Sequence, residues 1–203
     1  MRFVQWILSM MLFINGLAIA QVWTLYSKSS SDLPDDHINA IVVDQNQIKW
    51  FGTHGGLVSF DGFVWHTALT SNKVLDIATL PGVQTNLLWI ATDGGLLLIR
   101  VNEADDIEIL NEYRTDNSDI LSNNCKAVSI DKSGNGWVGT DTGLSLLKDR
   151  NWTNLTGDDD KLSHPDILDI GSRSDGFQYI ATRGGGITRL TCDEIDGITA
   201  ASV

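Results

Sequence analysis

Proline, cysteine and basic side chains are all scarce in this chain of 203 residues. Three prolines and two cysteines exclude a collagen-like chain and a disulfide-rich scaffold. The 14 lysines and arginines are outnumbered by 26 acidic residues, which gives a formal net charge of -12. Such a deficit of positive charge argues against a partner that presents phosphates, either a nucleic acid or an anionic membrane surface. No helical periodicity persists long enough after the N-terminal segment to form a coiled coil.

Glycine and tryptophan are plentiful by contrast. The chain has 19 glycines and seven tryptophans, with 42% hydrophobic and 20% charged residues. This composition is typical of a folded, turn-rich β protein, and the length is ample for an independent core.

The first twenty residues have the pattern of an export signal. Arg2 supplies a positive charge, an apolar stretch follows from Phe3 to Leu17, and Ala18-Ile19-Ala20 ends the segment. A charged start, an apolar middle and an A-x-A end are typical of a cleaved signal peptide, and the apolar run is marginal for an uncleaved membrane anchor. We therefore expect residues 1–20 to be a signal peptide and the rest to be periplasmic or secreted, without a stable membrane anchor.

A repeat dominates the remaining sequence. Its shared skeleton is an aromatic residue, an apolar residue, Gly or Ala, Thr, two variable positions, Gly and an apolar run. Four segments fit it: WFGTHGGLVSF from Trp50, WIATDGGLLLI from Trp89, WVGTDTGLSLL from Trp137 and YIATRGGGITRL from Tyr179. The aromatic anchors are 39, 48 and 42 residues apart. A period near 40 residues is typical of propeller blades or similar repeat units.

Each unit is predicted to contain four short antiparallel strands. In the first unit these are residues 38–43, 48–53, 57–60 and 63–67, separated by polar or glycine-containing turns. Asp61-Gly62 between two apolar runs is a strong hairpin signal. The sequence thus predicts an all-β fold with about four blades, spanning residues 33–72, 73–120, 121–161 and 162–203.

The repeat resembles the two-component regulator propeller repeat. The resemblance rests on Leu-Pro, an alternating strand, Asp, W-x-G-T-x-x-G-L and a closing Asp-Gly, and it covers about Leu33 to Leu190. The second unit departs from the pattern, with Leu80-Pro81-Gly82 in place of the strand-closing Asp. The resemblance implies a periplasmic, bacterial sensor propeller attached to hybrid histidine kinases, many of which are implicated in glycan detection.

Ring closure is left open by the sequence. Residues 21–32, with Trp23-Thr24-Leu25-Tyr26, are similar to a fourth strand and are expected to be the outer strand of a closing blade. Rings of this repeat generally have more than four blades, so we expect the N-terminal part of a longer propeller. An open arc would expose strand edges and apolar faces that favour association with further blades or other partners.

Ligand-binding candidates come from the turn between the second and third strands of each unit. In propellers of this strand order that turn shares a rim with the loops that link blades. The first variable position of T-x-x-G and two loop histidines are therefore expected to bind ligand: His54, Asp93, Asp141, Arg183, His37 and His164. The interblade loops are expected to share that face: Asp35-Asp36-His37, Asn123-Asn124 and Ser163-His164-Pro165. The alternative is that these exposed turns are simply polar.

Other repeated residues are predicted to be structural. The Thr column is expected to supply hydrogen bonds within blades, and the Trp columns are expected to pack between blades. Cys125 occupies a buried strand position, and a bridge to Cys192 is open but not favoured. The sequence contains no recognised motif for a nucleophile, a phosphate loop or a metal, so we expect no enzyme activity, no cofactor and no metal.

Three functions remain. The first is an exported ligand-sensing propeller, or a piece of one, that binds a saccharide and acts through a membrane histidine kinase. The second is a secreted scaffold for protein partners. The third is a propeller lyase or hydrolase whose site is assembled from several blades.

Overall fold

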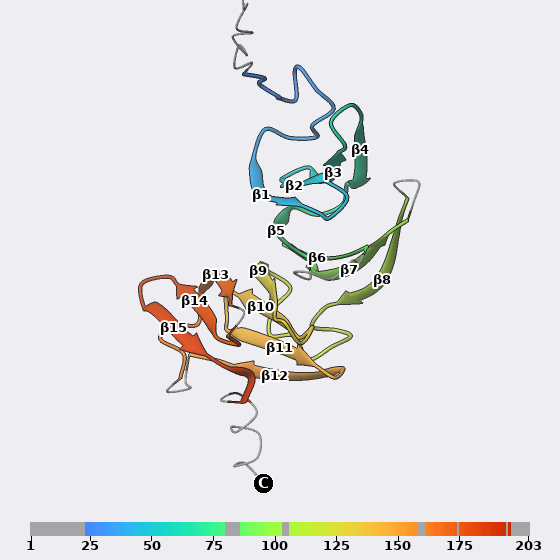
Figure 1. Cartoon of the computed structure of the whole chain (residues 1–203). Helices are drawn as coiled ribbons and strands as arrows, with labels where there is room; N and C mark the ends of the chain where they lie inside the picture. The colour runs from blue at the N-terminus through green and yellow to red at the C-terminus, as the bar shows by residue number, and fades with distance from the viewer. Residues whose placement is uncertain are drawn as a thin grey trace, which may run out of the picture.

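The computed structural model describes residues 23–79, 86–102, 106–157, 161–173, 175–193 and 195, and all of their strands lie in four antiparallel sheets (Figure 1). The predicted signal peptide lies outside these residues. The first sheet contains β1 (Ile38–Val43), β2 (Lys49–Thr53), β3 (Gly56–Phe60) and β4 (Trp65–Leu69). The second contains β5 (Val74–Thr79), β6 (Leu87–Thr92), β7 (Gly95–Val101) and β8 (Ile107–Tyr113). The third contains β9 (Cys125–Ile130), β10 (Gly136–Thr140), β11 (Leu144–Lys148) and β12 (Asn151–Leu155), and the fourth contains β13 (Ile167–Ser172), β14 (Gln178–Thr182) and β15 (Gly186–Leu190).

Within each sheet, strands follow one another in chain order, and the first strands of successive sheets pack together. This is the arrangement of propeller blades, and it confirms the predicted all-β class with four repeats. The fourth blade has three strands among the described residues, the last of which ends at Leu190.

The repeated threonine closes the central hairpin of each blade, as predicted. Thr53 Oγ1 donates to the carbonyl of Gly56 at 2.9 Å and accepts from the amide of Gly55 at 3.0 Å. The bond to the glycine carbonyl recurs in the other three blades from Thr92, Thr140 and Thr182. Gly56 has a φ of 118°, and a Cβ there would lie 1.8 Å from the carbonyl oxygen of Leu69 in β4. Blade one therefore requires glycine at position 56 both for its conformation and for the close approach of the fourth strand.

A glycine on the second strand of blades one and three receives a side chain from the next blade. A Cβ added at Gly52 would lie 2.6 Å from Val74 Cγ1, and one added at Gly139 would lie 2.4 Å from Ile167 Cγ2. Val74 and Ile167 each begin the first strand of the following blade. The blades thus interlock through a socket beside the repeated aromatic residue.

Three hydrophobic clusters fill the three interfaces between consecutive blades. Trp50 lies in the cluster between blades one and two, Trp89 between two and three, and Trp137 between three and four. Trp50 and Trp137 are fully buried, which confirms their predicted packing role. Burial of these three indoles removes apolar area from water at every interface and helps to hold successive blades together.

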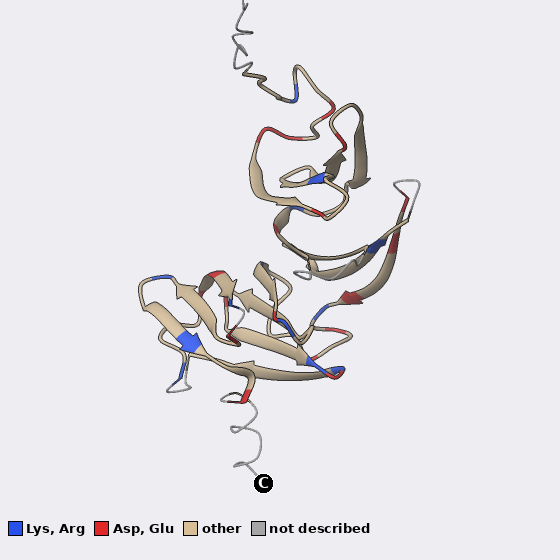
Figure 2. Ribbon diagram, viewed as in Figure 1, with Lys and Arg blue, Asp and Glu red and all other residues tan. Residues whose placement is uncertain are grey.

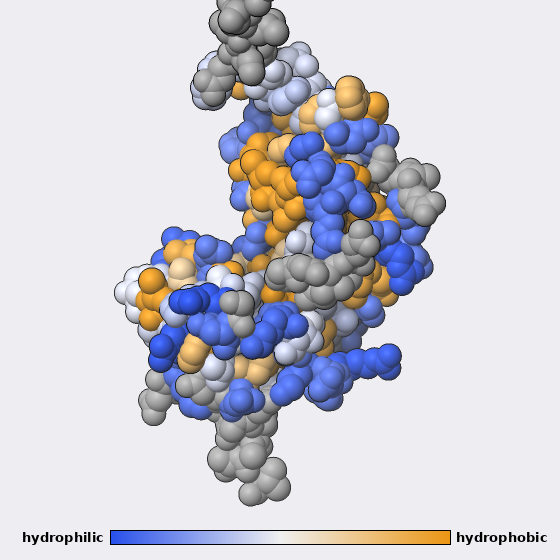
Figure 3. All heavy atoms as spheres, in the orientation of Figure 1, coloured by the Kyte–Doolittle hydropathy of each residue, from blue (hydrophilic) through white to orange (hydrophobic). Residues whose placement is uncertain are grey.

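The outer faces of the first and last blades are not covered by another described blade. No cluster of described residues joins blade one to blade four, and the two lie at opposite ends of an arc (Figure 1). Ile41 on β1 is 64% exposed and Ile187 on β15 is 72% exposed. Hydrophobic residues gather visibly over β1 and β2 in Figure 3.

The segment before the first blade carries exposed aromatic side chains. Residues 23–27 form no strand, and Trp23 is 88% exposed. Only Tyr26 packs on blade one, with its ring 5.4 Å from that of Phe60 and 5.3 Å from that of Trp65. The role of residues 21–32 as the outer strand of a closing blade therefore stays a prediction. In the described part of the chain, no helix has both the length and the apolar character needed to cross a bilayer.

Candidate functional site

The turns between second and third strands lie against the loops that link the blades, as expected for one rim of a propeller. A Cβ added at Gly55 would lie 2.9 Å from Pro34, and one added at Gly94 would lie 2.7 Å from Asn72. In the fourth blade, a Cβ at Gly185 would lie 2.7 Å from His164. The predicted site residues therefore all lie at this end of their blades, which we call the upper rim.

In each blade, the first turn residue is paired with the residue that precedes the first strand. The pair in blade one consists of His37 and His54, whose rings stack at 4.6 Å with an angle of 8°. The amide of His54 donates to the carbonyl of His37 at 3.2 Å. Asp35 accepts from the amide of His37 at 2.7 Å and lies 2.9 Å from its Nδ1.

Blades two and three join the same two positions through an aspartate. Asp93 accepts from the amide of Lys73 at 3.0 Å and donates its own amide to the Lys73 carbonyl at 3.2 Å. Asp141 Oδ2 accepts from Asn124 Nδ2 at 3.1 Å. Each carboxylate thus holds the rim turn against the loop that enters its own blade.

Blade four makes an ion pair at these positions. Arg183 Nε donates to Asp166 Oδ2 at 2.6 Å, and Lys126 from blade three pairs with the other carboxylate oxygen. His164 Nδ1 accepts from the amide of Asp166 at 3.1 Å. Arg183 is largely exposed, so its guanidinium lies at the surface beside a carboxylate that it shares with Lys126.

The carboxylates of the third and fourth rim pairs are held in the charged form. Burial of Asp141 raises its pKa, but hydrogen bonds from Asn124 and Ser122 outweigh burial, and the net pKa is below its ordinary value. Burial likewise opposes the charge of Asp166, and the contacts with Lys126 and Arg183 lower its pKa overall. Lys126 and Arg183 thus lie beside the Asp166 carboxylate at the rim, and Figure 2 shows where acidic and basic residues fall along the ribbon of blades three and four.

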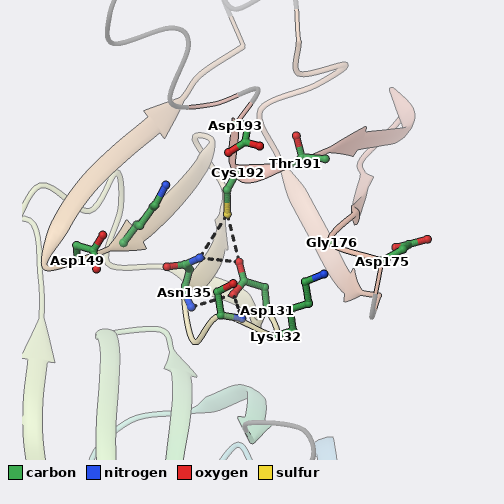
Figure 4. A pocket seen from close by; sticks show the side chains of 11 residues that line it. Asp131, Lys132, Asn135, Asp149, Asp175, Gly176, Thr191, Cys192 and Asp193 are labelled. Atoms are coloured by element: carbon green, nitrogen blue, oxygen red, sulfur yellow. Dashed lines mark hydrogen bonds between the residues drawn. The ribbon is translucent and has the colours of Figure 1, made fainter.

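A cavity of about 430 Å³ lies at the opposite end of blades three and four. Asp131 and Cys192 line it, with Cys192 Sγ 3.2 Å from Asp131 Oδ2 (Figure 4). Asp131 also accepts from the indole of Trp137 at 3.2 Å, just as Asp44 accepts from Trp50 at 3.0 Å. Because this carboxylate has the same structural role in two blades, we favour the upper rim over this cavity as the binding site.

Both cysteines are free, so the open question of a bridge is answered. Burial raises the pKa of the Cys125 thiol to about 12. The pKa of Cys192 is also raised to about 12, first by burial and then by its contact with Asp131. Neither thiol is thus in the reactive thiolate form near neutral pH.

Sequence reasoning found the turn member of each rim pair, and it placed Asp35, His37 and Asn124 in interblade loops of the same face. Lys73 and Asp166 were not predicted as site residues, although each directly precedes the first strand of a blade. The available signal was the repeat position directly before the first strand of each blade. A residue there must face the hairpin turn once β1 and β2, or their equivalents, pair in register.

No protein-family model matches the sequence, and no curated protein matches it either. Solved structures do match. The extracellular domain described as that of a hybrid two component system, BT3049 from B. thetaiotaomicron, is 20% identical, with a TM-score of 0.63 over 81% of this chain and 24% of that chain. The corresponding domain of BT4673, from the same organism, is 19% identical, with a TM-score of 0.66 over 82% of this chain and 23% of that one.

This chain shares the fold of those extracellular domains. It spans about a quarter of their length. A gluconolactonase from Xanthomonas campestris, XC5397, is a more distant match, at 11% identity and a TM-score of 0.57 over 76% of this chain and 56% of that one. At these identities the likeness establishes the propeller fold, and function has to be argued from the site.

Proposed function

We propose that the chain is an exported ligand-sensing propeller module of a two-component system and that its upper rim binds a saccharide. The module binds its ligand outside the membrane and acts through a histidine kinase on the other side. Catalysis has no part in this role.

The chemistry of the rim pairs supports a polyhydroxylated ligand. Asp93, Asp141 and Arg183 place carboxylate oxygens and a guanidinium on adjacent turns of one rigid scaffold. Hydroxyl groups both donate and accept, so a surface that alternates fixed acceptors and donors can hold a sugar without a net charge on the ligand. The variation of the pair from blade to blade favours recognition, because a purely structural contact would not need four different solutions.

The fold supports the assignment to signalling. The two extracellular domains that this chain matches are described as parts of two-component or one-component systems. The apolar start of the chain, with its A-x-A end, supports export. The single observation that carries the proposal is the rim of paired polar side chains on a sensor-type propeller.

A glycan screen followed by calorimetry tests this proposal. The full chain is titrated with candidate saccharides in the presence of a chelator, and then Asp141→Asn and Arg183→Ala are titrated with any that bind. We expect each substitution to weaken binding by about tenfold or more, since each removes a charged partner from the site.

Asp175→Asn is the matched control, because Asp175 is an exposed carboxylate beside the opposite cavity. If Asp175→Asn weakens saccharide binding as much as the rim substitutions do, the binding site lies at the opposite end of the blades. Absence of binding across the screen would remove the saccharide part of the proposal.

The second candidate, a scaffold for protein partners, is supported by the exposed apolar faces of blades one and four. Ile41 and Ile187 lie on these opposite faces. Sedimentation that shows concentration-dependent association, without saccharide binding, would favour it. The third candidate, a lyase or hydrolase, would require turnover of a glycan or a lactone by the purified chain.

A further inference from the structure

The rim pair of blade one differs in kind from the other three. Blades two to four join the two positions through a carboxylate that accepts from a backbone amide, an amide side chain or a guanidinium. Blade one places two imidazoles there, His37 and His54, stacked face to face at 4.6 Å. Two imidazoles do not complement one another as an acid and a base do, because protonation of both would bring two like charges together.

A carboxylate completes this pair as a set of metal ligands. Asp35, His37 and His54 each offer one ligand atom, and these three atoms all lie within 4.8 Å of one another. Asp35 Oδ1 and His37 Nδ1 are 2.9 Å apart, which matches the roughly 3.0 Å between two ligands at 90° to one another around an ion with bonds of about 2.1 Å, as in octahedral coordination. His54 is on the turn between β2 and β3, and its exposed ring lies against that of His37.

The backbone already holds the three residues in place. The His54 amide donates to the His37 carbonyl, and the His37 amide donates to Asp35. These bonds fix the loop to the turn before any ion arrives, so little chain entropy is lost on binding.

We infer that Asp35, His37 and His54 form a binding site for a divalent transition-metal ion on the rim of blade one. Two imidazoles and one carboxylate suit Zn²⁺ or Ni²⁺ better than Ca²⁺ or Mg²⁺, which prefer oxygen ligands. In blade one the ion takes the place that an aspartate has in the other blades and ties the hairpin turn to the entering loop. This inference goes beyond the proposed sensor function and does not depend on it.

Calorimetry with Zn²⁺ tests the site on the full chain, purified without a histidine tag and treated with a chelator. We expect one ion per chain, and we expect His37→Ala and His54→Ala each to weaken binding by about tenfold or more. His66→Ala is the matched control, because His66 lies on β4 and is not part of the cluster. Loss of Zn²⁺ binding in His66→Ala, or unchanged affinity in both cluster variants, would overturn the inference.

Paramagnetic Ni²⁺ provides a second readout that locates the ion directly. Broadening of amide signals is expected around residues 35–37 and 53–55. Broadening centred on Asp131 and Cys192, the other place where a thiol and a carboxylate meet, would overturn the assignment to the rim. Because the saccharide titration is done with chelator present, its outcome and the outcome here are independent.

Discussion

The interface between blades three and four and the outer face of blade four present the same repeat columns in two different environments. Trp137 on β10 is fully buried against blade four, whereas Tyr179 in the same column of β14 is only partly buried. Gly139 receives Ile167 from the next blade, whereas Ala181 in the same column has no described blade beyond it. The repeat therefore contains two kinds of position. The threonine and glycine of the turn close the hairpin of their own blade, whereas the aromatic and small residues contact the next blade.

The hydrogen bond that closes the hairpin persists in blade four at the end of the arc. The close contacts with an adjacent strand or blade are absent there among the described residues. The hydrogen bond from Thr182 to Gly186 is kept in blade four at 3.1 Å. A Cβ at Gly186, however, meets nothing within 4 Å, while one at Gly143 would lie 2.3 Å from the carbonyl oxygen of Leu155. Blade four lacks a described fourth strand, so its glycine keeps the turn conformation without the close contact.

Removal of the interfacial indole should have the largest effect on stability. We expect Trp137→Ala to cost about 3–5 kcal/mol of unfolding free energy, because it leaves a cavity between two blades. It also removes the donor to Asp131. Tyr179→Ala should cost about 1 kcal/mol, since the ring packs on one side only. Urea unfolding of both variants checks this, and equal costs would mean that blade four is covered in solution.

The carboxyl of Asp76 should make stability depend on pH. Its Oδ2 accepts from the Val128 amide of the next blade at 2.8 Å. Burial raises its pKa from 3.8 to about 6, against the opposing effect of backbone hydrogen bonds. The folded chain therefore binds this proton more tightly, so the resulting stabilisation is complete below pH 3.8 and is lost as the pH rises through about 6.

The loss corresponds to about 3 kcal/mol for a pKa of about 6 against 3.8. We expect the stability difference between the unmodified chain and Asp76→Asn to fall by up to this amount between pH 3 and pH 7, because the amide does not titrate. Denaturant unfolding across this range measures it. If the free energy of unfolding depends on pH in the same way in both proteins, the Asp76 carboxyl is not buried against blade three.

Two glycine-to-alanine substitutions test whether a side chain of the next blade fills the space beside Gly139. Gly139→Ala would place its Cβ 2.4 Å from Ile167 Cγ2, and we expect a cost of about 1–2 kcal/mol from the forced shift of blade four. Gly171→Ala on β13 meets nothing within 4 Å and should stabilise by roughly 0.5 kcal/mol, because alanine restricts the unfolded chain. Thermal melting of the two variants should move in opposite directions, and a shared direction would exclude the socket.

The fold could be predicted because its signals are local and repeated. The aromatic, small and Thr positions recur at fixed offsets, and each offset has one geometric role within a hairpin. The fourth strand of blade one was placed about two residues early, because Asp61 accepts from the amides of Phe63 and Val64 and extends the turn. Side-chain capping of this kind depends on rotamer and is not visible in an apolar pattern.

The site could be predicted in part. His54, Asp93, Asp141 and Arg183 occupy a recognisable column, so their common rim followed from the strand order. Their partners come from the loop before the first strand, and the loop residue that makes the contact depends on the register of the first hairpin, including its irregularity between Ile38 and Ala40. No short sequence window contains both members of a pair, which are separated by about half a blade.

The receiving socket beside each repeated aromatic has an evolutionary consequence. The small residue at Gly52 recurs at Ala91 and Gly139. A duplicated unit therefore packs on the preceding blade through the same kind of surface as the unit from which it was copied. Stability in such a chain is a sum over nearest neighbours. Blades can therefore be gained by tandem duplication without changes elsewhere, while each individual hairpin keeps its structure.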